Sequence, residues 1–249
     1  MRIVYPSLPY EPQTIDPMWE PEFQWARNSG MEVALFDVET SKLFSRQSAT
    51  SPALYRGWML SETEYEALEQ LTSLRINRAQ YVSSHQATGW YNQIAKYTFT
   101  SVFQPASDPL DFTDGQRYFV KGVVKSFGAD SVVSSEAQYV HLLEKHQVPA
   151  DEVLFVREFV ELKPELERRF FVVAGVAYGA KQTELPAELQ PVLVQLIPRL
   201  FYSLDVVQQA FGEYCVVEVG DGQVSDLKEW DVTDFCETVL RKLAAANLK

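Results

Sequence analysis

Cysteine and histidine are scarce in this sequence, and their scarcity excludes two classes of protein. The 249 residues include only two cysteines and three histidines. Two cysteines cannot form a disulfide framework, and with so few residues of both types we expect no metal held by His and Cys. We therefore expect a reduced, cytoplasmic protein. A hard cation held by carboxylates stays compatible with the composition, because the chain contains 34 Asp and Glu residues.

Long apolar runs and an excess of positive charge are missing as well. No segment approaches the roughly 18 to 20 consecutive apolar residues that cross a bilayer, so we expect no membrane span. The 34 acidic residues outnumber the 22 basic ones, which gives a net charge of −12. Such a surface repels phosphate backbones on average, so we expect no nucleic-acid partner. The first residues, MRIVYPSLPYEP, also lack the basic and apolar stretches of a secretory signal.

Strand and helix patterns alternate along the first part of the chain. Apolar and β-branched runs predict strands at residues 2–7, 32–36 and 53–60, and a helix at residues 17–28. Ser61 and Glu64 have the spacing of a capping box, which predicts another helix directly after the third strand. This repetition is typical of a small α/β lobe with a parallel sheet.

The later part of the chain has the pattern of an α+β protein. A helical connection is expected over residues 77–109. Strands are expected at residues 117–126, 153–160, 168–178 and 214–219, and helices at residues 134–146, at residues 186–210 and from residue 233. Asp221 and Gly222 form a turn dipeptide that predicts a hairpin after the last of these strands.

Two lysines are the first candidates for chemistry. Lys121 lies within an expected strand and Lys125 follows four positions later, so both ammonium groups would project from one face. Ser126 and Gly128 come next in a short loop whose backbone N–H groups could approach a phosphate closely. The alternative is a pair of exposed lysines beside a turn.

Arginines at two strand boundaries are the second group of candidates. Arg157, Glu158 and Glu161 lie in or after an apolar run, which also fits an edge strand with a solvated face. Arg169 leads into the apolar run FFVVAGV. Its planar guanidinium could clamp a phosphate or a carboxylate bidentately, or it could form a surface pair with Glu167.

Three carboxylates near the end of the chain suggest a metal site. Glu218 stands among apolar neighbours, and the expected hairpin would bring it beside Glu229 and Asp231, which are two residues apart. Converging carboxylates are costly unless a cation neutralises them, and Mg²⁺ is the natural occupant. The alternative is a hairpin with outward-facing acids, which explains Glu218 poorly.

Taken in order, the motifs from Tyr118 to Asp231 resemble those of the ATP-grasp superfamily. They are a strand lysine before a small-residue loop, an apolar strand leading to a hinge, an E-x-R entering a strand, and an acid followed by a hairpin and a motif similar to E-x-N. The segments YRGWML, RINRAQY, SSH and WY are similar to a compact clade of that superfamily.

The resemblance implies a fold class that combines α/β and α+β. A small Rossmann-like lobe would occupy residues 1–100. Two α+β subdomains, at residues 101–155 and 156–249, would follow and grip a nucleotide between them.

The resemblance also implies roles for residues on the nucleotide side. Lys121 would bind the α- and β-phosphates of ATP, and Lys125 would lie near the same phosphates or an acyl intermediate. Ser126, Gly128 and the rest of their loop would cover the triphosphate, although this loop has only one glycine. The hinge would begin at Arg157, with adenine contacts from Glu158 and Val160, and Glu161 would contact the ribose. Glu167 and Arg169 would face the cleft, with Arg169 near the phosphate or acyl-phosphate charge.

By the same resemblance, Glu218, Glu229 and Asp231 would hold magnesium. Asp231 stands where the family usually has Asn, which adds negative charge to that site. Arg56 and His85, in the smaller lobe, are candidates for substrate contacts. For His85 a structural role is an equal alternative.

The implied activity is that of an ATP- and Mg²⁺-dependent ligase. Such an enzyme joins a carboxylate to an amine or a thiol through an acyl phosphate, and its partners are small-molecule or peptide substrates. A non-catalytic ATP-binding protein with an assembly or regulatory role is the alternative. The third possibility is a structural acidic protein whose motifs coincide by chance.

Overall fold

The N-terminal part of the chain forms a five-stranded sheet, as the alternating pattern predicts. The computed structural model describes residues 1–45, 51–163, 166–196, 199–209 and 212–246. The central strand β1 (Arg2–Leu8) is parallel to β3 (Glu32–Asp37) and β5 (Ala53–Tyr55). The antiparallel strands β2 (Glu11–Ile15) and β4 (Lys42–Ser45) complete the sheet. The predicted parallel pairing is confirmed, although β5 ends five residues before the predicted limit.

Two helices accompany this sheet, α1 (Glu20–Asn28) and α2 (Glu62–Leu71). The predicted capping box of α2 is present, because the Ser61 hydroxyl accepts from the Glu64 N–H while the Glu64 carboxylate accepts from the Ser61 N–H. The two bonds satisfy N–H groups that the helix would otherwise leave unpaired. Local sequence therefore determines where α2 begins.

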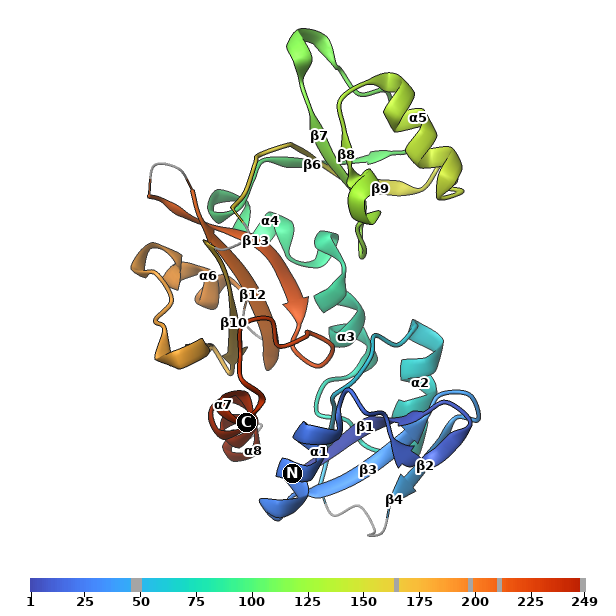
Figure 1. Cartoon of the computed structure of the whole chain (residues 1–249), viewed down its shortest axis with the longest axis vertical. Helices are drawn as coiled ribbons and strands as arrows, with labels where there is room; N and C mark the ends of the chain where they lie inside the picture. Colours follow the sequence, from blue (N-terminus) through green and yellow to red (C-terminus); the bar gives the residue numbers. More distant parts are fainter. Residues whose placement is uncertain (46–50, 164–165, 197–198, 210–211, 247–249) are drawn as a thin grey trace.

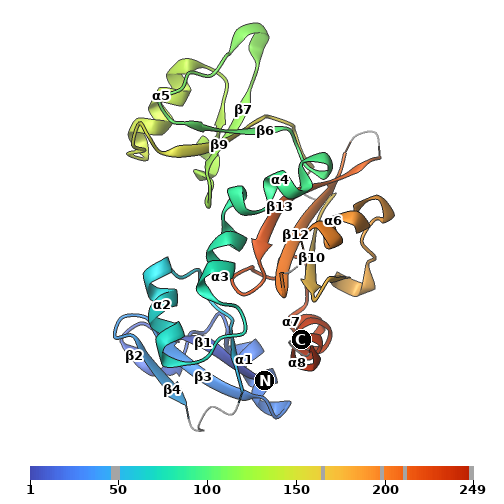
Figure 2. The same ribbon diagram turned by 180° about the vertical axis from the view of Figure 1, so that it is seen from behind.

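Short helices lead from this sheet to the next, as predicted. They are α3 (Arg78–His85), η1 (Ala87–Gly89), α4 (Tyr91–Ile94) and η2 (Ala95–Tyr97). Figure 2 shows α3 between the N-terminal sheet and a second sheet. The helical prediction is wrong for the end of this region, because β6 (Ser101–Pro105) is a strand.

A small four-stranded sheet stands apart from the rest at the top of Figure 1. Its order is β6-β9-β7-β8, formed with β7 (Tyr118–Gly122), β8 (Val132–Val133) and β9 (Val153–Glu158). Helix α5 (Glu136–Lys145) packs beside it, and the Ser135 side chain caps its first turn. Strands β7 and β9 and helix α5 lie where the sequence predicts them, although all three are shorter than their predicted ranges.

The third sheet is antiparallel, with the order β11-β10-β12-β13. Its strands are β10 (Glu167–Val173), β11 (Val176–Gly179), β12 (Phe201–Gln208) and β13 (Tyr214–Asp221). The single strand predicted at residues 168–178 is a hairpin, since Ala174 and Gly175 turn the chain with positive φ angles of 49° and 82°.

The helix predicted at residues 186–210 is also wrong. Only α6 (Gln190–Gln195) and a preceding short turn, η7 (Ala187–Leu189), are helical, and β12 is a strand; residues 197–198 and 210 lie outside the described residues. Residues 201–207 of β12 are all buried, because β10 and β13 flank it and both of its faces are covered. A strand buried on both faces has no alternation that distinguishes it from a buried helix.

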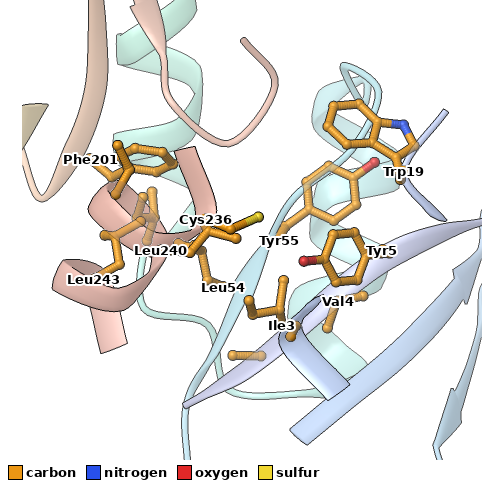
Figure 3. Close-up of a cluster of buried hydrophobic side chains, with 14 of the residues drawn as sticks. Ile3, Val4, Tyr5, Trp19, Leu54, Tyr55, Phe201, Cys236, Leu240 and Leu243 are labelled. Carbon is orange, nitrogen blue, oxygen red and sulfur yellow. The ribbon is translucent and has the colours of Figure 1, made fainter. Parts of the chain in front are cut away.

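In the described residues that follow β13, no second hairpin strand is present. Residues 222–231 form an irregular segment, and the chain then continues through α7 (Val232–Phe235), a π-helical segment η8 (Cys236–Leu240) and α8 (Arg241–Ala245). This terminal helix returns to the N-terminal lobe. Figure 3 shows Cys236, Leu240 and Leu243 in one buried cluster with Ile3 and Leu54.

The hydrophobic clusters therefore join segments that are distant in sequence. Among the described residues, one cluster combines the N-terminal sheet with the C-terminal helix, and a second combines residues 87–94 with the β10–β13 sheet. A third lies within the small upper sheet and α5. The predicted limits of the three domains, at residues 100 and 155, stay predictions. None of the helices in the described ranges has both the length and the apolar character needed to cross a bilayer.

Candidate active site

A cleft of about 560 Å³ lies where residues of the small upper sheet meet residues of the β10–β13 sheet, and Trp58 and Met59, which follow β5, also line it. The upper sheet contributes Lys121 and Arg157, and the β10–β13 sheet contributes Arg169, Asp205 and Glu218. Lys125, Ser126 and His85 also line the cleft. The structure thus brings together most of the charged residues that the sequence singled out on strands.

An ion pair spans this cleft from one sheet to another. The Nζ atom of Lys121, on β7, donates to Oε1 of Glu218, on β13, at 2.5 Å. Lys121 is only 5% exposed. Burying an ammonium group requires a partner of opposite charge, and Glu218 provides it.

Lys125 and its loop lie differently from the strand prediction. Strand β7 ends at Gly122, so Lys125 is a loop residue and the predicted shared strand face is wrong. Lys125 and Ser126 nevertheless line the cleft, and Ser126 pairs with Lys121 in an isolated β-bridge. Gly128 has a positive φ of 63° in the 3-10 turn η4 (Gly128–Ser131), outside the cleft lining.

The side chain of Arg157, on β9, enters the cleft from the upper sheet. Its guanidinium donates to the Val217 carbonyl at 3.2 Å and lies within 6 Å of three ring centroids, those of Phe99, Phe119 and Phe155. The side chain is 9% exposed, and burial lowers the pKa of the guanidinium. It nevertheless stays charged at neutral pH. Arg157 therefore places a positive charge in the cleft beside Lys121.

Arg169 is held in one orientation by Asp205. Its Nε and Nη2 atoms each donate to a different Asp205 carboxylate oxygen at 2.8 Å, and Nη1 bonds Asp226. Burial alone would raise the pKa of Asp205, but the hydrogen bonds and charges of Arg169 and Lys228 lower it below its usual value. Asp205 is therefore a buried, ionised carboxylate.

Asp205 and Glu218 are direct neighbours across strands β12 and β13. Among the described residues, no group of three or more His, Cys, Asp or Glu side chains is arranged to hold a metal ion. Asp205 and Glu218 line the cleft from this sheet together with Asp221, which ends β13. Sequence analysis missed Asp205 because the apolar run around it was interpreted as a helix.

Glu229 and Asp231 do not join Glu218, which corrects the predicted triplet. The missing hairpin is the physical reason, since residues 222–231 contain no strand that pairs with β13. The Glu229 carboxylate accepts from the backbone N–H of Arg169 at 2.8 Å. The Asp231 carboxylate caps α7, accepting from the N–H groups of Thr233 and Asp234. Both side chains act within the fold, outside the cleft lining.

Arg56 also has a role inside the fold, so the structure does not place it at a substrate. Its side chain is fully buried and pairs with Glu22 through Nε and Nη2. Its Nη1 donates to the carbonyls of Gly222, Gln223 and Ser225. These bonds connect α1 to the segment after β13.

The remaining predicted residues lie around the hinge and are not part of the cleft lining. Glu158 is exposed at the end of β9, and Val160 and Glu161 are exposed on the connection from β9 to β10. Glu167, at the start of β10, pairs with Lys228 at 2.6 Å. Residues 164–165 of this connection lie outside the described residues. The adenine and ribose roles stay predictions.

These features identify the class of protein. A family model for the ATP-grasp domain, R2K clade family 3, matches residues 41–243, which is most of the chain, so this protein belongs to that family. The resemblance stated from the motifs is confirmed at the level of fold and family.

Solved structures with the same fold are similar over nearly the whole chain. An ATP-grasp RimK domain protein from Sphaerobacter thermophilus is 14% identical, with a TM-score of 0.66 over 96% of this chain and 100% of that one. The D-alanyl-alanine synthetase A of Vibrio cholerae is 13% identical, with a TM-score of 0.59 over 99% of each chain.

A third similar structure is the ATP-grasp ligase PsnB, solved with a minimal precursor, Mg and ADP. It is 12% identical, with a TM-score of 0.58 over 97% of this chain and 98% of that one. A comparison with curated protein sequences found no match.

Proposed function

We propose that this protein is an ATP- and Mg²⁺-dependent ligase that joins a carboxylate to an amine or a thiol through an acyl phosphate. The observation that carries the proposal is the Lys121–Glu218 pair, which spans a cleft that Arg157 and the Asp205–Arg169 pair also line. Membership of the ATP-grasp family supports it, and so does the similarity to PsnB, a ligase solved with Mg and ADP.

The cleft residues fit a magnesium nucleotide by their charges. Lys121, Lys125 and Arg157 supply positive charge for the phosphates. Asp205 and Glu218 supply the one or two carboxylates with which Mg²⁺ usually joins substrate phosphates. When bound, the metal neutralises phosphate charge during transfer. We expect the Lys121–Glu218 pair to separate on binding, with the ammonium turning to a phosphate.

Arg169 is the candidate for stabilising charge on the transferred phosphoryl group or the acyl phosphate. Its bidentate bonds to Asp205 fix the guanidinium, so little rearrangement is needed during reaction. The chain needs no protein nucleophile for this chemistry, since alignment and charge neutralisation supply most of the catalysis.

The less central assignments are also part of this proposal. Ser126 and Gly128 belong to the loop expected over the triphosphate. Contacts to adenine and ribose are assigned to the end of β9 and the connection after it, at Glu158, Val160 and Glu161. Glu167 orients Lys228 toward Asp205. Small carboxylic acids or peptides are the expected substrates, and the cytoplasm is the expected location.

Nucleotide binding is the first test. The melting temperature should rise when millimolar MgCl₂ and the non-hydrolysable analogue AMPPNP are added together. Lys121→Ala should weaken nucleotide binding roughly tenfold or more, because a charged hydrogen bond to phosphate is lost. Lys96→Ala removes an exposed lysine outside the cleft and should bind as the wild type does. Absence of any shift in the wild type would overturn the proposal.

Turnover is the second test and separates the two candidate functions. Release of ADP from ATP should require Mg²⁺ together with pooled amino acids or short peptides, and EDTA should abolish it. Nucleotide binding without ADP release for any acceptor would instead support a non-catalytic ATP-binding protein with an assembly or regulatory role.

A further inference from the structure

Two side chains at one end of the cleft carry buried polar atoms that make no hydrogen bond within the described part of the chain. Both ring nitrogens of His85 and the Oδ2 atom of Asp221 are buried and make no hydrogen bond. Both residues line the cleft, His85 at the end of α3 and Asp221 at the end of β13. Buried polar groups are normally satisfied, so two such residues in one cleft indicate a missing ligand.

The neighbours of Asp221 leave its Oδ2 atom without a hydrogen bond, although the Gln223 side chain lowers the pKa of this carboxyl. Its side chain is 1% exposed, and Oδ1 accepts from the Gln223 N–H at 2.8 Å, which leaves Oδ2 unbonded. The nearby Tyr65 and Tyr81 hydroxyls donate to the carbonyls of Ile76 and Leu60.

The two arginines whose charges act on Asp221 make their hydrogen bonds to other groups. Arg56 bonds Glu22 and three carbonyls. Arg199 bonds the Ser84 hydroxyl and the Gly89 carbonyl at 2.8 and 2.7 Å. Burial raises the pKa of Asp221 to about 7, in spite of the hydrogen bonding of Gln223 and the charges of both arginines. The carboxylate thus lacks a compensating cation.

His85 is the second polar group at this end. Burial and the nearby Lys125 charge lower its pKa to about 4, so the ring is neutral at physiological pH. A neutral imidazole has one N–H donor and one acceptor nitrogen. The ring stands edge-on to Tyr81, with centroids 4.1 Å apart, which fixes its position.

An apolar wall completes this end of the cleft. Trp58 and Met59 follow β5, line the same cleft and are 51% and 38% exposed. The Trp58 indole is held by a hydrogen bond from Nε1 to Asp16 and by an edge-to-face contact with Trp19. A large, fixed aromatic surface open to a cleft suits an apolar or cationic substrate group.

We infer that this end of the cleft binds a substrate carrying a protonated primary amine and an apolar or aromatic group. Asp221 accepts from the ammonium, His85 makes a second polar contact, and Trp58 with Met59 covers the apolar part. The inference rests on the proposed function and specifies the class of amine substrate. A carboxylate in the same place would meet the buried Asp221 charge and be repelled.

The experiment uses a matched pair of probes on the full chain with Mg²⁺ and AMPPNP present. L-phenylalaninamide carries a cationic amine, and N-acetyl-L-phenylalaninamide has the same side chain without the charge. Isothermal titration should show binding of the first and no binding of the second at equal concentration. Asp221→Asn should weaken the amine roughly tenfold or more, because it removes the charge partner.

Controls separate this inference from the proposed function and from misfolding. Asp234→Asn removes an exposed carboxylate outside this cleft and should bind the amine as the wild type does. Asp221→Asn retains the Oδ1 acceptor for Gln223 and should keep the wild-type melting temperature or exceed it. Its AMPPNP affinity should also stay within about twofold. Equal binding of both probes, or unchanged amine binding in Asp221→Asn, would overturn the inference even if the nucleotide binds normally.

Discussion

At the level of single residues, several charged side chains of the cleft are paired with one another. Lys121 and Glu218 bond across the cleft, while Arg169 and Lys228 share Asp205. Such pairs offset the cost of burying the charges in the free protein. When a nucleotide and a cation bind, the phosphates and the cation can replace these partners. Asp221 is different, because its second oxygen has no partner.

Asp221 also makes the stability of the protein depend on pH. Burial raises its pKa to about 7, above the value of about 3.9 for an unfolded aspartate, so the native state binds the proton more strongly. Stability is therefore lost as the pH rises from about 4 to about 7. From pH 5 to pH 8, the difference in free energy of unfolding between Asp221→Asn and the wild type should therefore increase by roughly 2–3 kcal/mol in favour of the variant.

Urea denaturation at pH 5, 6, 7 and 8 measures this difference. The groups that face Asp221 do not interfere, because Tyr65 and Tyr81 have raised pKa values and Arg56 and Arg199 stay charged. For the exposed control Asp234→Asn, the free energy of unfolding should depend on pH as it does in the wild type. Parallel curves for Asp221→Asn would contradict the buried, ionising carboxyl.

At the scale of elements, local signals located helix starts and missed the strand buried on both faces. The capping box of Ser61 and Glu64 identified α2 because both of its bonds are local. Strand β12 gave no such signal, and with it Asp205 was lost from the predicted site. The sequence predicted a terminal helix from residue 233, but it did not indicate that this helix packs against the N-terminal lobe.

That packing partner predicts a stability effect in the N-terminal lobe. Leu240, in the π-helical segment η8, is fully buried in the cluster that contains β1 and β5. Leu240→Ala should lower the free energy of unfolding by about 2–5 kcal/mol, because it leaves a cavity. The control Leu71→Ala, at a residue 44% exposed, should cost far less. Equal losses in urea denaturation would show that Leu240 is not part of this core.

At the scale of the whole molecule, the N-terminal lobe and the β10–β13 sheet are connected through Arg56. Its side chain joins Glu22 of α1 to carbonyls of the segment after β13, and it lies over the rings of Trp19 and Phe235. The connection fixes the segment that forms one wall of the cleft, since Val224 and Ser225 line it.

Removing this connection should destabilise the whole chain. Arg56→Ala leaves the buried Glu22 without its partner, and we expect a loss of about 3–5 kcal/mol. Arg78→Ala, which breaks exposed pairs with Glu62 and Glu66, should cost less than about 1 kcal/mol. Chemical denaturation compares the two, and similar losses would refute a structural role specific to Arg56.

The sequence by itself determined the family, the order of most elements and the strand positions of Lys121, Arg157, Arg169 and Glu218, because motif spacing and side-chain periodicity are local properties. The tertiary structure decided which of these residues meet. Glu218 pairs with Lys121 and neighbours Asp205. Glu229 instead accepts a hydrogen bond from the Arg169 backbone N–H, and Asp231 caps the start of α7. Such partners come from segments up to 97 positions apart, and only the packing of the sheets sets those contacts.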